Sequence, residues 1–188
     1  MSTEVRADPP GFAYTKLEAQ GRRAVLADHF IEVKTDADAF SLVVESNIDV
    51  TRSPVLLPEA AAAAKALLGA AAATPPAKDA ERPGEARVIR DDGNRCEFEV
   101  DARRDAILFV ADNYFPNFEA TVDGEKTEIW RANYSYRALP VKQGKHRVEF
   151  RWRPYDFQAG AALTALSVIG LAATVALGRG ASKASLHS

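Results

Sequence analysis

The chain has 188 residues, of which 47% are hydrophobic and 27% are charged, and its 24 Lys and Arg against 26 Asp and Glu give a formal net charge of −2. This balance is typical of a globular protein with one or two domains, and it excludes collagen-like, disulfide-framework and intrinsically disordered proteins. The near-neutral charge argues against a nucleic-acid partner. A lone cysteine, Cys96, excludes an internal disulfide and a thiolate metal site, and the histidines are far apart in the sequence, so neither a metal nor another cofactor is expected.

Residues 1–58 are predicted to form a mixed strand and helix portion. The elements expected there are, in chain order, strands over 13–18 and 29–34, a helix over 36–44 and a brief strand over 52–58. Thr35 or Asp36 is the expected N-cap of the helix, because a side-chain oxygen at that position accepts hydrogen bonds from the first turn. Acidic residues follow in that turn, where the helix dipole favours negative charge.

Residues 59–85 are predicted to form an alanine-rich helix followed by a polar Pro/Gly linker. The run EAAAAAKALLGAAAA over 59–73 has a high helix propensity despite Gly69, and prolines stop it. Leu67 and Leu68 are its only large apolar side chains. We therefore expect an exposed insertion rather than part of the core, and we assign it no chemistry.

Residues 86–156 are predicted to form an antiparallel β-sandwich or open barrel, so that the chain is mainly β. The hydrophobic pattern has a period of two over most of this stretch. Cys96 and Phe98 share one phase and are expected to point inward, whereas Glu97 is expected to point outward. The apolar run over 106–111 is expected to be a central strand that is covered on both faces.

The turns between these strands are marked by glycine. Asp123 and Gly124 form the strongest hairpin signal, because both residues tolerate the positive φ of a type I′ turn, and Gly144 marks a further turn. We assign these three residues as structural turns. His146 shares the inward phase of the last strand, and no motif marks a Ser, Cys or carboxylate partner for it, so we expect a satisfied histidine rather than a catalytic base.

Sequence motifs that carry chemistry are absent. The sequence contains no phosphate-binding glycine loop, dinucleotide fingerprint, zinc-protease motif, nucleophile elbow or pair of closely spaced cysteines. We therefore assign no catalytic residue.

Residues 157–178 contain no charged side chain. As a helix, at about 1.5 Å per residue, this stretch is about 33 Å long and matches a hydrocarbon core of about 30 Å, so a C-terminal transmembrane helix is predicted, followed by a short polar tail over 179–188. Small residues at four-residue spacing, such as Gly160 and Thr164, allow another helix to approach closely. The alternative is a buried hairpin helix of a soluble protein.

The residues alone do not decide which side of the membrane each end of this predicted span faces. Residues 1–11 contain no apolar stretch after a basic start, so no secretory signal is expected. The chain is then either tail-anchored and faces the cytosol, or it is the end of a longer membrane protein whose earlier helices set the topology. Basic residues near the span are more numerous on the β-rich side, so the positive-inside count by itself places that side in the cytosol.

Residues 105–160 carry an ordered set of short motifs. They are, in chain order, Tyr114-Phe115-Pro116 after a strand, Val122-Asp123-Gly124, Arg131-Ala132-Asn133, Arg137-Ala138, Gly144-Lys145-His146-Arg147-Val148-Glu149-Phe150, and Arg153-Pro154 before the apolar segment. Taken together in this order, they resemble the C-terminal extracytoplasmic domain and last membrane helix of the bacterial YfhO-like membrane protein family. A looser resemblance extends upstream to about Ala24.

This resemblance implies a polytopic membrane protein of the GT-C glycosyltransferase type, which uses lipid-linked sugars in cell-envelope glycosylation. In that family the catalytic acidic residues lie in the first extracytoplasmic loops, and that region is not in this chain. The resemblance therefore implies a non-catalytic segment whose β domain docks on or supports the membrane catalytic part. The implied partners are the lipid bilayer, other transmembrane helices and, through the parent protein, a polyprenyl-phosphate sugar.

The resemblance also implies a location in the bacterial cytoplasmic membrane, with the β domain extracytoplasmic and the C-terminus cytoplasmic. This orientation is opposite to the one that the positive-inside count indicates, and we follow the resemblance. An alternative function from another class is a self-sufficient, tail-anchored β-sandwich module that binds a protein or a glycan.

The candidate docking or ligand-contact residues are Arg131, Asn133, Arg137 and His146. The first three follow a predicted hairpin, and their donors are suited to a phosphate, sugar hydroxyls or the carbonyl groups of a neighbouring loop. Intramolecular docking, ligand contact and plain solvation are all open for them.

Overall fold

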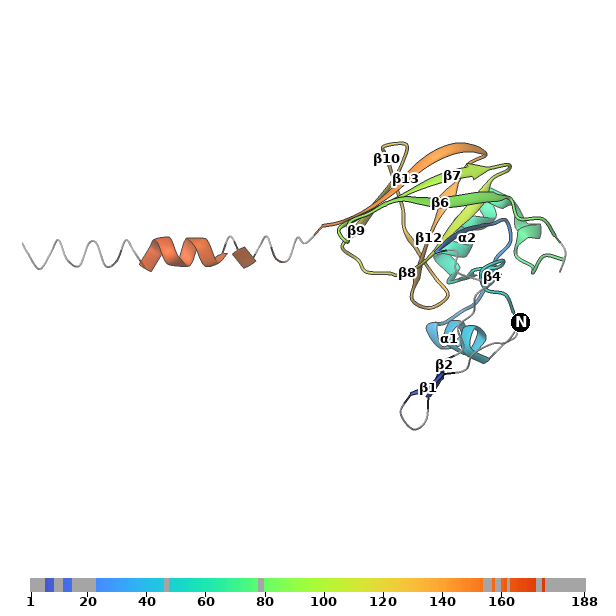
Figure 1. Ribbon diagram of the computed structural model, residues 1–188, viewed down its shortest axis with the longest axis horizontal. Coiled ribbons are helices and arrows are strands. Elements are labelled where there is room, and N and C mark those ends of the chain that lie inside the picture. Colours follow the sequence, from blue (N-terminus) through green and yellow to red (C-terminus); the bar gives the residue numbers. More distant parts are fainter. Residues whose placement is uncertain are drawn as a thin grey trace, which may run out of the picture. The chain divides into compact units, whose positions relative to one another are not determined.

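The computed structural model describes residues 6–8, 12–14, 23–45, 48–77 and 80–153, and in the C-terminal part residues 157, 160–161, 163–171 and 174 (Figure 1). The chain divides into two units, one up to Arg151 and one from Trp152 onward, and each is described by itself. The first unit is mainly β, as predicted, and has two large sheets, one of them curled into a half-barrel.

The five-stranded sheet has the order β10-β9-β13-β7-β6. Its strands are β6 (Gly84–Asp91), β7 (Arg95–Ala102), β9 (Phe118–Val122), β10 (Glu125–Thr127) and β13 (Gly144–Trp152). β10 pairs with β9, and β7 pairs with both β13 and β6, in antiparallel register. The period-two pattern predicted β7 and β13 correctly.

The six-stranded sheet has the order β3-β8-β12-β11-β5-β4. Its strands are β3 (Ala24–Ala27), β4 (Ile31–Glu32), β5 (Val55–Leu56), β8 (Ala106–Asn113), β11 (Trp130–Ala132) and β12 (Tyr136–Val141). β4 and β5 pair in parallel and the other neighbours are antiparallel. Strands from the N-terminal portion therefore complete a sheet whose centre comes from residues 106–141.

The N-terminal predictions need correction at three strands. The strand expected over 29–34 is reduced to β4, the one expected over 52–58 is reduced to β5, and β3 was not predicted. All residues of β3 are buried, because Leu26 faces the other sheet and Val25 faces the opposite side, so this strand shows no alternation. Of the strand expected over 13–18, residues 13–14 lie in β2 (Phe12–Tyr14), which pairs with β1 (Arg6–Asp8), and the rest lies outside the described residues.

One hydrophobic core fills the space between the two sheets. Phe98 of β7 and Phe150 of β13 meet edge to face with ring centroids 5.9 Å apart, and Leu108 of β8 is fully buried in the same cluster. Cys96 belongs to this cluster, as its phase predicted, and burial raises the pKa of its thiol to about 11. The thiol is therefore protonated and inert at neutral pH.

The sheets approach each other at the edges formed by β3 and β6. A Cβ atom on Gly84 would lie 2.0 Å from the carbonyl oxygen of Asp101 and 2.9 Å from the Cδ1 atom of Leu26. Only glycine fits at this close approach.

A second core lies on the other face of the six-stranded sheet, and helix α2 (Pro58–Leu68) covers it (Figure 1). Ala61 and Ala64 have no exposed surface and belong to the same cluster as Ile107 and Phe109 of β8. The prediction of an exposed insertion is therefore wrong. The small alanine side chains let the helix lie close to the sheet, and they supply the second cover that the buried strand over 106–111 requires.

The ends of the helices are set by local chemistry. α2 ends at Leu68, earlier than predicted, because Gly69 adopts φ +88° and donates its N–H to the Lys65 carbonyl at 2.8 Å; a short 3-10 helix, η1 (Ala70–Ala72), follows. α1 (Asp36–Glu45) is capped by Thr35, as predicted: the Thr35 hydroxyl accepts a hydrogen bond from the Asp38 N–H at 3.2 Å, and the Asp38 carboxylate accepts one from the Thr35 N–H at 3.0 Å.

The second unit contains a helical stretch whose described residues include 163–171. The side chains of Leu163, Leu166, Val168 and Ile169 are 61–66% exposed. Within the described residues, no helix has the length and apolar character needed to cross a membrane, so the structure does not support the transmembrane helix predicted over 157–178. Several residues of that segment and the whole tail over 179–188 lie outside the described residues.

Candidate functional site

The four candidate residues from the sequence do not form one site. Arg131, Asn133 and Arg137 belong to β11, β12 and the turn between them, whereas His146 lies on β13 of the other sheet. Each of the four makes contacts within the domain.

Asn133 holds an N-terminal segment against the β11–β12 turn. It is 1% exposed, its Oδ1 atom accepts a hydrogen bond from the Val55 N–H at 2.7 Å, and its Nδ2 atom donates to the Val50 carbonyl at 3.1 Å. Its own N–H donates to the Val55 carbonyl at 2.9 Å, and its φ of +48° is one that asparagine tolerates. Where β5 meets the turn, the Asn133 side chain thus makes a hydrogen bond that the backbone of a neighbouring strand would otherwise make.

Arg131 forms an ion pair with Asp36 in the first turn of α1, and its side chain is 35% exposed. This contact joins β11 to the start of the helix. An ion pair with this much exposure contributes little to stability.

Arg137 is buried at the end of the core between the sheets. Its guanidinium carbon lies 4.2 Å from the centroid of the Phe118 ring and 5.0 Å from that of Phe150, and its Nη2 atom is 2.9 Å from the Asp112 carboxylate. Burial lowers the pKa of Arg137. Two aromatic faces and one carboxylate thus stabilise a guanidinium that is 5% exposed.

Asp112 was not predicted, although it is the centre of this cluster. It also accepts hydrogen bonds from Arg23, with its Oδ1 and Oδ2 atoms 2.8 Å from Nε and Nη2 of that side chain. Arg23 in turn pairs with Asp91. The sequence signal was its phase, because Asp112 continues the inward alternation of Leu108 and Val110, where a carboxylate requires a partner.

His146 joins two turns. Its Nδ1 atom lies 2.7 Å from the Asp123 carboxylate and its Nε2 atom lies 3.1 Å from the Lys142 carbonyl. Asp123 also accepts a hydrogen bond from the Arg147 N–H at 2.8 Å, and that bond, followed by the one from His146, lowers the pKa of Asp123. Both ring nitrogens are occupied, so this His–Asp pair lacks the free nitrogen that a general base needs.

The hairpin between β9 and β10 has the predicted turn. Asp123 adopts φ +53° and Gly124 adopts φ +88°, which are the positive values of a type I′ turn. Gly144, at φ +134°, begins β13 beside the ring of His146. A groove of about 470 Å³ lies beside these turns, with Leu67, Val122 and Pro140 among its lining residues.

The outer face of the five-stranded sheet is a network of charges across β7 and β13. Arg95 pairs with Glu97 at 2.7 Å and with Glu149 at 2.6 Å, and Arg147 donates to Glu97 from its Nε atom at 2.8 Å. The hydrogen bond from Arg147 lowers the pKa of Glu97. The expected outward phase of Glu97 is correct, but its carboxylate is not solvated: the arginines cover it completely, and it has 0% exposed surface.

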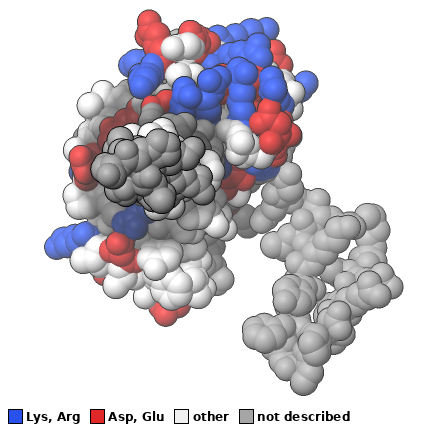
Figure 2. All heavy atoms as spheres, turned by 90° about the vertical axis from the view of Figure 1, so that its left-hand side faces the viewer, with Lys and Arg blue, Asp and Glu red and all other residues white. Residues whose placement is uncertain are grey.

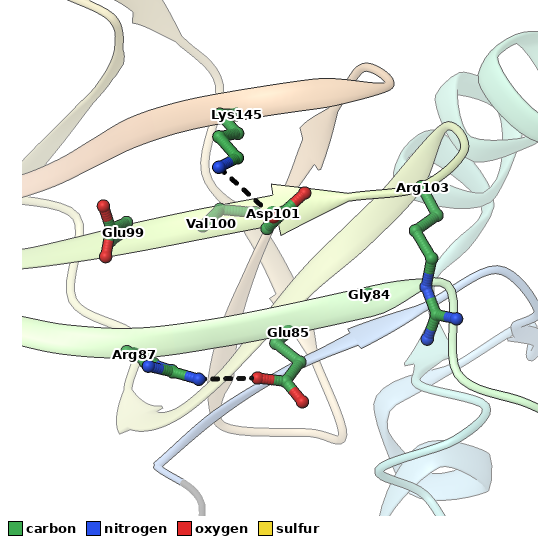
Figure 3. Close-up of a pocket in the computed structure, with 8 residues that line it drawn as sticks. All are labelled: Gly84, Glu85, Arg87, Glu99, Val100, Asp101, Arg103 and Lys145. Atoms are coloured by element: carbon green, nitrogen blue, oxygen red, sulfur yellow. Dashed lines mark hydrogen bonds and ion pairs between the residues drawn. The ribbon is translucent and has the colours of Figure 1, made fainter.

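A shallow bowl of about 530 Å³ adjoins this network (Figure 3). Its charged residues come from β6, β7, β13 and the loop after β7. Arg87 donates to Glu85 at 3.1 Å, and the Lys145 ammonium lies 3.9 Å from the Asp101 carboxylate. Figure 3 shows the Glu99 carboxylate on the same sheet without a dashed contact to the other drawn residues. The bowl therefore offers alternating donors and acceptors to a polar partner.

In the part of the chain that the structure describes, no three His, Cys, Asp or Glu side chains are placed to hold a metal ion. The charged clusters of that part consist mainly of arginine and carboxylate pairs, although Nε and Nη1 of the buried Arg137 have no hydrogen-bond partner. No protein-family model matches the chain, and no curated protein and no solved structure is similar to it.

Proposed function

We propose that this chain is a non-catalytic segment of a YfhO-like membrane glycosyltransferase. Its β domain supports the membrane catalytic part, which acts with lipid-linked sugars in cell-envelope glycosylation, and residues 157–178 tether it to the bacterial cytoplasmic membrane. The β domain faces the extracytoplasmic side and the C-terminus faces the cytoplasm. The proposal rests on the motif order of the last third and on one structural observation.

The observation that carries the proposal is the exposed apolar stretch in the second unit. Leu166, Ile169 and Leu171 are 64–67% exposed, in a segment without a charged residue from 157 to 178. Exposed apolar surface of this kind is typical of contact with lipid or with another apolar helix. The interior of the β domain agrees with a structural role. Its polar residues Asn133 and Arg137 bind other residues of the same domain.

Membrane extraction tests this proposal. The chain is expressed in bacteria, membranes are washed with alkaline carbonate, and the chain is followed by immunoblot. We expect it to stay with the membranes until detergent is added, and to co-purify in mild detergent with a membrane protein of many helices. A chain that washes off with carbonate, or that purifies from plain buffer as a monomer, contradicts the tether.

A self-sufficient tethered binding module is the second candidate, and the bowl of Figure 3 is the observation that favours it. Paired charges such as Lys145 and Asp101 provide both donors and acceptors for a protein or glycan. The two candidates differ in their partners. A supporting domain needs a catalytic membrane chain as its partner. A self-sufficient binding module keeps its affinity for a glycan or protein even in a strain that lacks all such catalytic chains.

A further inference from the structure

Basic side chains lie in rows on the outer face of the five-stranded sheet. In one row Arg87 and Arg147 stand on either side of Glu99, and in the last row Arg95 is opposite Arg151. Lys and Arg side chains gather in the upper part of Figure 2, with acidic side chains among them. The arginine face, as we name it, consists of Arg87, Arg90, Arg95, Arg147 and Arg151.

The acidic partners of Arg95, Arg147 and Arg151 lie beneath the arginines, whereas those of Arg87 and Arg90 are exposed. The side chains of Glu97 and Glu149 are 0% and 18% exposed, whereas that of Arg147, which pairs with Glu97, is 64% exposed. Arg151, which pairs with Glu149, is 40% exposed. Above Glu97 and Glu149 the network therefore presents arginine rather than carboxylate to solvent.

On β7 and β13 the outward basic residues are concentrated at one end of the sheet. Near Gly84 the row of Glu85, Asp101 and Lys145 is mixed, and both acids are more than half exposed. Toward the other end β7 and β13 present Arg95 and Arg151, while the exposed Asp91 and Asp92 lie at the end of β6 and in the turn after it. This is the end at which β13 finishes and the chain continues toward its apolar segment.

We propose that the arginine face binds the phosphate groups of an anionic phospholipid bilayer. This inference rests on the proposed membrane tether. Only a few residues separate Arg151 from Phe157 in the sequence, and they include Trp152 and Arg153, residue types that favour the lipid headgroup region. Six residues of extended chain span at most about 20 Å, so a segment that enters lipid at Phe157 leaves Arg151 within about that distance of the bilayer surface.

The form of the face favours a bilayer over a nucleic acid. Strands lie about 4.8 Å apart and alternate residues about 6.7 Å apart, so the guanidinium groups are spread over a surface in two directions, like a layer of headgroups. Single-stranded nucleic acids are bound by aromatic side chains on which bases stack. The outward positions of β7 and β13 in these rows are occupied only by charged residues, such as Arg95, Glu99 and Arg147.

Vesicle binding by the full chain tests the inference. Flotation compares vesicles of phosphatidylcholine with vesicles that also contain phosphatidylglycerol. The test variant is Arg87→Gln, Arg90→Gln and Arg151→Gln, which keeps Arg95 and Arg147 on the covered carboxylates. The control variant, Lys34→Gln, Lys65→Gln and Lys142→Gln, loses the same charge from residues outside the face.

We expect the wild type and the control to bind anionic vesicles about tenfold or more tightly than neutral ones, with a difference that shrinks in high salt. The test variant loses this difference and keeps its binding to neutral vesicles. Equal binding to both vesicles, or an unchanged difference in the test variant, overturns the inference. Release from anionic vesicles by an equal charge of RNA also overturns it, in favour of a nucleic-acid surface. If the wild type does not bind neutral vesicles, the membrane tether is refuted. That result contradicts the proposed function rather than the role of the arginine face.

Arginine footprinting provides a second measurement that does not depend on the strength of the tether. Phenylglyoxal modifies accessible guanidinium groups, and mass spectrometry reports each position. We expect Arg87, Arg90 and Arg151 to be protected on anionic vesicles but not on neutral ones. Equal modification of these residues on the two kinds of vesicle overturns the inference.

Discussion

Asn133 and Val55 are joined by two hydrogen bonds, one in each direction. The Asn133 N–H donates to the Val55 carbonyl at 2.9 Å, and the Val55 N–H donates to the Asn133 side-chain oxygen at 2.7 Å. Residues far apart in the sequence are thereby fixed at the edge of one sheet. This pair explains why a polar side chain identified as a candidate ligand contact is fully buried.

Replacing Asn133 is therefore expected to destabilise the domain. Asn133→Ala leaves the Val55 N–H and the Val50 carbonyl without their buried partner, which costs about 1–3 kcal/mol of unfolding free energy. The measurement is urea unfolding of the full chain in mild detergent, followed by tryptophan fluorescence. Asn94→Ala in an exposed turn is the control and should change stability by less than about 0.5 kcal/mol. Equal effects of the two variants would contradict the docking role.

The packing of α2 predicts opposite responses at two neighbouring alanines. Ala64→Leu adds volume against the six-stranded sheet, where Ala64 has no exposed surface, and is expected to cost about 1–3 kcal/mol through overpacking. Ala62→Leu on the exposed side of the helix should be nearly neutral. Thermal unfolding of both variants checks the difference. An Ala64→Leu protein as stable as the wild type would contradict the packing of α2 against the six-stranded sheet and would favour an exposed insertion.

Asp112 and Arg137 are expected to be strongly coupled. Asp112→Ala leaves the buried guanidinium without its carboxylate and should cost about 3–5 kcal/mol, whereas Arg137→Met keeps the apolar contact with Phe118 and Phe150. The double variant should recover much of the stability lost in Asp112→Ala. A double-mutant cycle based on urea unfolding measures the coupling, and additive effects would show that the ion pair contributes nothing.

Acid unfolding is expected to depend on Asp123. The hydrogen bonds from the Arg147 N–H and His146 lower its pKa below the ordinary value of 3.8. The pKa of Asp123 is therefore lower in the folded state than in the unfolded state. The resulting stabilisation is complete when the pH is above the pKa of the unfolded state, and it is lost as the pH falls through the pKa of the folded state. Asp123→Asn should lower stability at neutral pH and flatten the decline toward about pH 3, as followed by urea unfolding. A decline identical to that of the wild type would rule out this contribution.

Local patterns predicted much of the fold. Alternation predicted β7 and β13, the Asp123 and Gly124 turn was read from its dipeptide, and the cap of α1 from Thr35. These features depend on residues near one another in the sequence. The packing of Ala61 and its neighbours against β8 depends on a sheet assembled from distant strands, so composition alone misplaced the helix.

The candidate site was predicted less well for the same reason. Arg137 was identified, but its partner Asp112 belongs to another strand and has no motif. Glu97 was assigned to the outer face correctly, yet its coverage depends on Arg95 and Arg147, which extend along the same face. Strand phase gives the direction of a side chain, whereas its solvation is decided by the length of the neighbouring side chains.

The cover that α2 provides has a practical consequence for anyone shortening this chain. A fragment that begins at the repeating β pattern near residue 86 would lose the helix together with β3, β4 and β5, and would leave the apolar side chains of Ile107 and Phe109 facing water. Such a fragment should aggregate on refolding. Boundaries chosen for crystallisation or display should therefore begin before Arg23, so that both halves of the six-stranded sheet are made in the same polypeptide.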